Sequence, residues 1–204
     1  RCASQEAIAF GALQLRVVHP AASDYDERRS TNAMSCVLLV EFGAQRVLLT
    51  GDIPARQEAE LLARTALPRV TLLAAPHHGS RNSSSAALIS ATRPRWTLFQ
   101  AGYRNRFNHP DPEVQASYRA AGATLARTDH EGALQWRFAM ADGSRVRMTA
   151  ARRDLRRYWH NQPGGLVLAA DRGFDADAMA DEADGWSTGP TAPSSLDAPF
   201  ALGP

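Results

Sequence analysis

Apolar and polar residues alternate along the first quarter of the chain with the period of a half-buried strand. The segment 11–18 (GALQLRVV) repeats apolar positions at every second residue, and the segments 35–42 (SCVLLVEF) and 46–50 (RVLLT) flank the short stretch 43–45. A period of two places one set of side chains on the core side of a sheet. The pattern predicts three strands, the last two joined by a tight hairpin.

A helix is predicted after the third strand. In 54–65 (PARQEAELLART), Leu61 and Leu62 are expected to face the core, and Pro54 fits the first turn of a helix. Two further helices are predicted, one ending near Thr92 behind Ser83, Ser84 and Ser85, and one from Pro112 between the N-cap Asp111 and Gly122.

A continuous apolar run, 70–75 (VTLLAA), has the character of a central strand covered on both faces. Further strands are predicted at 95–102, 124–129, 132–138 and 144–150, with turns at Asp129–Gly132 and at Asp142-Gly143. Strands that alternate with helices, next to antiparallel hairpins, predict a layered α/β or α+β domain over residues 1–150.

The composition divides the chain into a basic body and an acidic tail. Residues 1–160 contain 22 Arg and 14 Asp or Glu, a balance of +8, whereas residues 161–204 contain one Arg and 7 acids, a balance of −6. A basic body suits a polyanionic partner. The Gly-, Pro- and Ser-rich tail, 161–204, has no periodicity and is predicted to be disordered, and 151–160 is a basic and aromatic terminal segment.

Side chains capable of catalysis follow several predicted strands. Asp52 comes after one strand, His77 and His78 after the next, His109 after another, and Asp129 with His130 after a fourth. Loops at the carboxyl ends of neighbouring strands can converge on one edge, where α/β proteins keep their sites. Each residue also has a structural interpretation: Asp52 could cap the following helix, and the histidines could order their turn.

Two groups of polar residues have alternative roles. Ser80 with the serines at 83–85 could bind phosphate, although helix capping is favoured. The segment 152–160 (RRDLRRYWH) could grip phosphates and stack a base, although a packed terminal helix is favoured. His19 and His160 are interpreted as structural.

Four motifs follow one another along the chain: NAMSCVLLVEFGAQRVLLTGDI at 32–53, APHHGSRNSSS at 75–85, NHP at 108–110 and RTDHEGAL at 127–134. Taken in this order, they resemble the DNA-internalisation competence channel proteins, the ComEC family. The resemblance covers roughly residues 1–140 and is to the distal part of the C-terminal metallo-β-lactamase-like domain. It implies part of an αββα sandwich with metals at one edge of the two sheets. It also implies an inner-membrane protein for DNA uptake, whose domain on the periplasmic side is a divalent-metal-dependent nuclease.

The resemblance also assigns residues. It implies metal ligands at Asp52, His77 and His78, with His78 favoured of the pair, and catalytic roles for Asp52, His78 and His109. It implies substrate or phosphate contacts at Asn32, Ser35, Ser80 and Arg81. Zinc or manganese ions would activate water and stabilise a phosphodiester displacement. The implied partners are DNA and a membrane channel domain, with no small-molecule cofactor.

One departure from the family is large. Its first metal motif, H-x-H-x-D-H, is missing from the sequence, and even one catalytic zinc needs three protein ligands. We therefore expect the upstream half of the domain to complete the site, and the chain alone to bind metal poorly and to be inactive. A catalytically inactive DNA-binding module using Arg81, Arg104, Arg106 and 152–157, or another hydrolase of the same fold, is the alternative.

The two cysteines, Cys2 and Cys36, are too few for a disulfide scaffold. From the residues alone, they are either two unrelated small apolar residues or a single bridge. The periplasmic location that the resemblance implies favours a Cys2–Cys36 disulfide.

Overall fold

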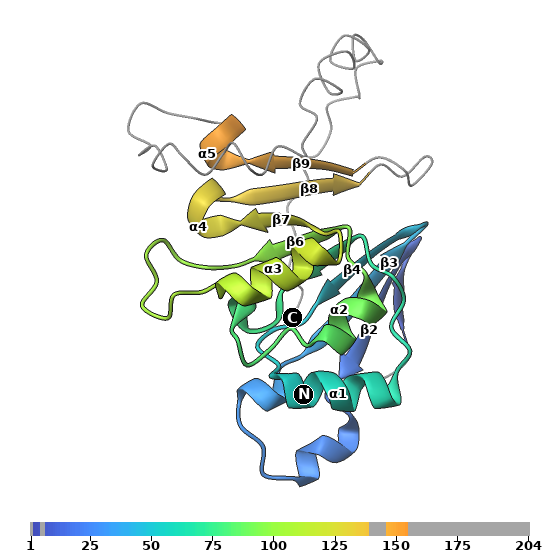
Figure 1. Ribbon diagram of the computed structural model, residues 1–204. Helices are drawn as coiled ribbons and strands as arrows, with labels where there is room; N and C mark the ends of the chain where they lie inside the picture. The colour runs from blue at the N-terminus through green and yellow to red at the C-terminus, as the bar shows by residue number, and fades with distance from the viewer. Residues whose placement is uncertain (1, 5–6, 139–145, 155–204) are drawn as a thin grey trace, which may run out of the picture. The chain divides into compact units, whose positions relative to one another are not determined.

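The computed structural model describes residues 2–4, 7–138 and 146–154 (Figure 1). Seven strands form a mixed sheet in the order β1-β2-β3-β4-β5-β6-β7, in which β1 to β4 are antiparallel neighbours and β4 to β7 are parallel. The strands are β1 (Ile8–Phe10), β2 (Leu13–His19), β3 (Val37–Phe42), β4 (Gln45–Leu49), β5 (Leu72–Ala74), β6 (Trp96–Phe99) and β7 (Thr124–Arg127).

Three helices make the crossovers between the parallel strands, as parallel pairing requires. They are α1 (Ala55–Arg64), α2 (Ala86–Thr92) and α3 (Pro112–Ala120). The shorter helices are η1 (Ala22–Asp26), η2 (Asn32–Met34), η3 (Pro76–Gly79), α4 (Thr128–Glu131) and α5 (Ala151–Asp154), and strands β8 (Leu134–Phe138) and β9 (Val146–Ala150) pair as a second, antiparallel sheet.

The main core lies between the helices and one face of the large sheet. Leu61 of α1, Ile89 of α2 and Tyr118 of α3 pack with Leu73 and Phe99 from the central strands. The Tyr118 and Phe99 rings meet edge to face, with their centroids 5.8 Å apart. The helices therefore cover one face of the central strands.

The small sheet covers the other face of the same central strands. Met148 of β9 belongs to a second apolar cluster with Leu72 and Trp96, and Phe138 of β8 meets Phe42 edge to face at 5.3 Å. The described residues therefore form three layers: helices, the seven-stranded sheet and the β8–β9 sheet.

The predicted mixed α/β class is confirmed, and each predicted strand and helix in the described residues has a counterpart. Two details differ. The short strand β1 was not predicted, and Thr128–Glu131 forms one helical turn where the sequence predicted a plain turn. The expected Asp142-Gly143 turn, residues 155–160 and the acidic tail 161–204 lie outside the described residues.

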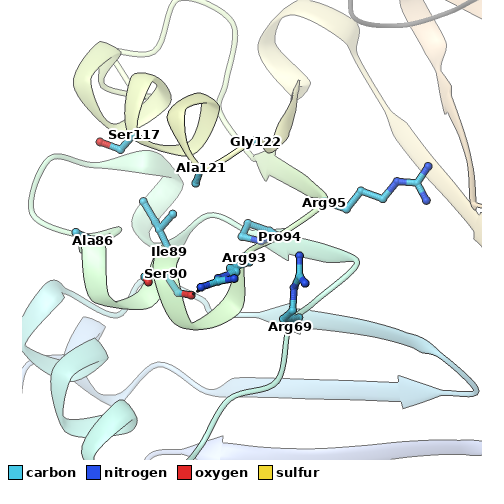
Figure 2. A pocket seen from close by; sticks show the side chains of 10 residues that line it. All are labelled: Arg69, Ala86, Ile89, Ser90, Arg93, Pro94, Arg95, Ser117, Ala121 and Gly122. Carbon is cyan, nitrogen blue, oxygen red and sulfur yellow. Dashed lines mark hydrogen bonds between the residues drawn. The ribbon is translucent and has the colours of Figure 1, made fainter.

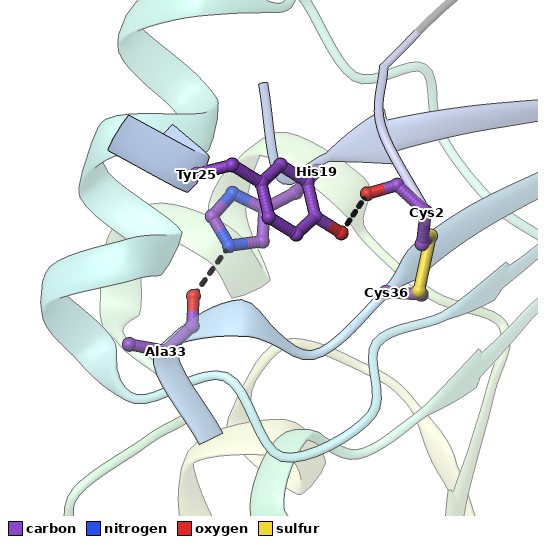
Figure 3. The surroundings of a disulfide bond; sticks show 5 residues. All are labelled: Cys2, His19, Tyr25, Ala33 and Cys36. Atoms are coloured by element: carbon purple, nitrogen blue, oxygen red, sulfur yellow. Dashed lines mark hydrogen bonds between the residues drawn. A yellow bond between two sulfur atoms is a disulfide. The ribbon is translucent and has the colours of Figure 1, made fainter. Parts of the chain in front are cut away.

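The predicted disulfide between Cys2 and Cys36 is present, with the two Cα atoms 6.0 Å apart. Beside it, the Tyr25 hydroxyl donates a hydrogen bond to the Cys2 carbonyl, and Nε2 of the buried His19 lies 2.9 Å from the Ala33 carbonyl oxygen (Figure 3). The bridge ties the N-terminal segment to the start of β3. His19 has the structural surroundings that its sequence context predicted.

Among the residues that the structure describes, none of the helices has both the length and the apolar character needed to cross a membrane.

Candidate functional site

The parallel strands bring the candidate residues to one edge of the large sheet. Asp52 follows β4, His77 and His78 follow β5, and His109 lies in the loop after β6. Because β4, β5 and β6 are parallel neighbours, their carboxyl ends lie side by side. We call Asp52, His77, His78 and His109 the histidine edge.

The backbone of the PHHG turn is unusual. His77, His78 and Gly79 have φ values of 49°, 58° and 79°, so three successive residues lie in the left-handed region. This conformation is unfavourable for residues with a Cβ, and it persists where surrounding contacts hold it, commonly at functional sites. The His77 N–H donates to the Gly51 carbonyl at 3.0 Å, which ties the turn to the end of β4.

Asp52 faces His78 rather than the following helix. Its Oδ1 lies 3.3 Å from His78 Nε2, and both side chains are partly open to solvent. The N-cap of α1 is Pro54, and no side chain caps that helix end. Asp52 therefore does not have the capping role that was the main structural alternative. Gly51 permits its close placement, because a Cβ there would come within 3.0 Å of the Ser35 Cβ.

His77 lies between two other imidazoles and an amide. Its ring centroid is 6.4 Å from that of His78 and 6.0 Å from that of His109. Nε2 lies 3.4 Å from the Asn32 amide nitrogen, so the structure places Asn32 beside the turn. The Nδ1 atom is buried and has no hydrogen-bond partner among the described residues.

His109 is positioned by its loop. The Asn105 side chain donates to the His109 carbonyl at 2.7 Å and accepts from the His109 N–H at 3.0 Å. The ring stacks on Phe107, with centroids 5.8 Å apart. Burial lowers the pKa of His109, and the nearby His77 and His78 lower this pKa further.

Two of the predicted phosphate contacts are occupied within the protein. Ser80 is buried, and its hydroxyl accepts from the Asn82 N–H at 3.3 Å. Arg81 pairs with Asp111 at 3.1 Å and with Glu113 at 3.3 Å. The Arg81 pairs involve residues at the start of α3, and these contacts leave less of either side chain available to a ligand.

The serine run has the capping role that the sequence favoured, with one partner that sequence reasoning missed. Ser85 is the N-cap of α2 and accepts from the Leu88 N–H. The fully buried Glu58 of α1 accepts from the N–H groups of Ser84 at 2.5 Å and Ser85 at 2.7 Å. An acid three residues before Leu61, on the apolar face of its helix, is the signal that could have identified it.

Asp129 is paired with Arg127 and does not belong to the histidine edge. The Arg127 guanidinium holds it through two hydrogen bonds, of 2.7 and 3.1 Å. His130 lies 3.6 Å from the same carboxylate and is half exposed. Burial is the main reason that the pKa of His130 is lowered, and Arg127 adds to it.

The histidine edge offers nitrogen and oxygen donors of the kind that zinc and manganese take. Among the described residues, Nδ1 of His77 has no hydrogen-bond partner, and Asp52 and His78 place a carboxylate beside an imidazole. However, the described residues contain no group of three or more His, Cys, Asp or Glu side chains placed to hold one ion. Within the described part of the chain, these residues do not complete a metal site.

A separate groove of about 790 Å³ lies at the opposite edge of the sheet, before β5 and β6. Its lining includes Arg69, Arg93 and Arg95 together with residues of α2 and α3, and Figure 2 shows Arg93 beside Ser90 while the Arg95 side chain extends away from both helices. In the described part of the chain, none of these three guanidinium groups forms an ion pair. Arg93 donates to the Ser90 carbonyl near the end of α2, as a C-terminal cap does.

Comparison with known proteins finds several relatives that are 32–35% identical to this chain. Competence protein ComA of Neisseria gonorrhoeae is 35% identical over 135 residues, which is 65% of this chain and 19% of the relative. ComE operon protein 3 of Bacillus subtilis is 32% identical over 62% of this chain and 16% of the relative. Recombination protein 2 of Haemophilus influenzae is 34% identical over 54% of this chain and 14% of the relative.

The chain therefore spans less than a fifth of the length of each of these relatives. No family model matches the chain.

Proposed function

We propose, for this ComEC-type chain, a role in DNA uptake in which the histidine edge acts on the phosphodiester backbone of DNA. The observation that carries the proposal is the convergence of Asp52, His77, His78 and His109 at the carboxyl ends of three parallel strands. The names of the relatives, two of which include the word competence or Com, support DNA uptake as the setting.

The residues of the histidine edge have distinct parts in this proposal. Asp52 Oδ1 lies 3.3 Å from Nε2 of His78 and thereby orients that imidazole. His109, held through its backbone by Asn105, is available to a leaving group or to a phosphate oxygen. Asn32 orients His77 through the contact at Nε2.

A divalent metal is part of the proposal, although the described residues do not complete its site. Zinc or manganese would supply Lewis-acid stabilisation of the phosphodiester. We propose that residues outside this chain provide the remaining ligands, in keeping with the metallo-β-lactamase-like sandwich that the family resemblance implies. The activity is therefore expected from the protein as its gene encodes it, and not from these 204 residues alone.

The test measures cleavage of end-labelled linear DNA by the full-length protein, with manganese or zinc supplied. Asp52→Asn and His78→Gln are expected to lower the rate by about 100-fold, the scale on which positioned acid–base groups act. His130→Gln is the matched control, because His130 is a half-exposed imidazole whose nearest acid is Asp129 rather than Asp52.

Intact DNA after incubation with the wild-type protein and either metal would contradict nuclease activity. If the full-length protein leaves DNA intact while the 204-residue chain binds DNA without metal, with an affinity that falls steeply with salt, the alternative of a binding module is supported instead.

A further inference from the structure

The loop between β6 and α3, residues 100–111, carries two large aromatic side chains on its surface. Tyr103 is 58% exposed and Phe107 is 63% exposed, and this loop projects beyond the strands and helices that it joins (Figure 1). A single exposed aromatic residue is ordinary, but two on one loop next to a candidate site form a surface suited to a ligand.

The same loop carries two arginines against these rings. The Arg106 guanidinium carbon lies 4.7 Å from the Phe107 ring centroid, and that of Arg104 lies 5.2 Å from the Tyr103 centroid. Neither Arg104 nor Arg106 forms an ion pair with any carboxylate that the structure describes. Their charge is therefore available to an anion from outside.

Hydrogen bonds hold the loop in this conformation. The Thr128 hydroxyl donates to the Ala101 carbonyl at 2.8 Å and accepts from the Ala101 N–H at 2.9 Å. At the other end, the Asp111 N–H donates to the Gly79 carbonyl at 2.9 Å. A loop that is already ordered loses little conformational entropy when a ligand binds.

Phe107 connects the loop to the histidine edge. The Phe107 ring is nearly parallel to that of His109, at an interplanar angle of 18°, and His109 in turn lies 6.0 Å from His77, centroid to centroid. A chain of rings therefore leads from the exposed loop to the candidate site.

We propose that Tyr103 and Phe107 form a stacking platform for unpaired bases of single-stranded DNA, with Arg104 and Arg106 contacting its phosphates. The proposal rests on the proposed function, since DNA is the substrate there, and it specifies which form of DNA the site receives. Aromatic faces stack on any base, and alternating cations track the backbone. In a duplex the base faces are covered by neighbouring pairs, so the platform selects a single strand.

The test is fluorescence anisotropy of the 204-residue chain with three labelled probes. These are a thymidine oligonucleotide of about 12 nucleotides, an abasic oligonucleotide of the same length, and a duplex. The wild type is expected to bind the thymidine probe more tightly than the other two. Phe107→Ala is expected to weaken binding of the thymidine probe roughly tenfold and to leave binding of the abasic probe unchanged. Phe107→Tyr is expected to bind the thymidine probe as the wild type does.

Matched variants separate stacking from charge and from folding. Phe10→Ala removes an aromatic side chain that is 62% exposed on β1, at the far end of the sheet order, and is expected to bind like the wild type. Replacing Arg104 and Arg106 by Ala is expected to weaken all three probes and to reduce the salt dependence. The same change at Arg69 and Arg95, in the opposite groove, is expected to have a smaller effect. Thermal unfolding checks that each variant is folded.

Two results would overturn the platform. One is that the wild type, Phe107→Ala and Tyr103→Ala bind the thymidine probe equally and also bind the duplex and abasic probes. This result would exclude the platform but would not contradict the proposed function. The other is failure of the wild type to bind any of the three probes, which overturns the proposed function of this chain's surface as well and leaves the loop as a candidate contact for a protein.

Discussion

Gly79 occupies a position in the PHHG turn that other residues cannot take without displacement. Its φ is +79°, and a Cβ there would come within 2.6 Å of the Phe99 ring and 2.8 Å of the Pro110 Cβ. Gly79→Ala is expected to lower the free energy of unfolding by about 3 kcal/mol, because backbone strain and overpacking act together. Urea denaturation followed by circular dichroism measures the change.

Gly11→Ala is the control for the backbone contribution. Gly11 has a φ of +60°, but a Cβ there would have no atom within 4 Å. Its replacement is expected to cost about 1 kcal/mol. Equal losses in the two variants would show that contact with Phe99 does not matter.

A single residue, His19, is expected to make the free energy of unfolding depend on pH. Burial is the largest influence on its pKa and lowers it below the ordinary 6.5, against the hydrogen bond to Ala33. The folded protein therefore favours the neutral ring, and the unfolded chain binds more protons below about pH 6.5. The stabilisation is fully present above that pH and is lost as the pH falls through the lowered pKa of the folded state.

Urea denaturation of the wild type from about pH 8 to about pH 5 is expected to show this loss. His19→Gln, which lacks a titrating ring, is expected to give a shallower dependence in the same range. Identical slopes for the two proteins would assign the effect to other groups.

At the scale of elements, Glu58 links α1 to α2 by hydrogen bonds, in addition to the apolar core that the two helices share. Its buried carboxylate on α1 accepts the N–H groups of Ser84 and Ser85 at the start of α2. Glu58→Gln is expected to lower the free energy of unfolding by about 2 to 3 kcal/mol, because one charge-assisted acceptor becomes an amide donor facing an N–H.

Chemical denaturation measures the change, with Glu113→Gln as the control. The Glu113 side chain is 76% exposed and pairs with the exposed Arg81, so its replacement is expected to change stability by less than about 1 kcal/mol. A loss at Glu113 as large as that at Glu58 would show that burial of the carboxylate is not the cause.

At the scale of the whole molecule, the Cys2–Cys36 bridge closes a loop of sequence separation 34. A cross-link that closes a loop of this length lowers the conformational entropy of the unfolded chain, which raises the free energy of unfolding by about 3 to 4 kcal/mol. Replacing both cysteines by serine is expected to lower the melting temperature, and adding a reductant to the wild type is expected to do the same.

The double variant should then be insensitive to reductant in the same thermal melt. A reductant that lowers the melting temperature of both proteins equally would indicate an effect unrelated to the bridge.

Much of the fold follows from the sequence, because each element carries its own periodic signal. The alternation in 11–18 predicts β2 (Leu13–His19), and the continuous apolar run 70–75 predicts β5 (Leu72–Ala74) between two covered faces. The strand β1 (Ile8–Phe10) was missed because three residues, all exposed, are too few to show a period.

The candidate site was also predicted only in part from the sequence. The sequence by itself determined which residue types follow the strands, and it placed Asp52 and the two histidines at strand ends. Only the tertiary structure decided that Asp52 meets His78 instead of capping α1, and that His77 lies beside His109. The reason is that parallel pairing brings together strand ends that are far apart in the sequence, and that the left-handed turn is tied to the end of β4 by the hydrogen bond from the His77 N–H to the Gly51 carbonyl.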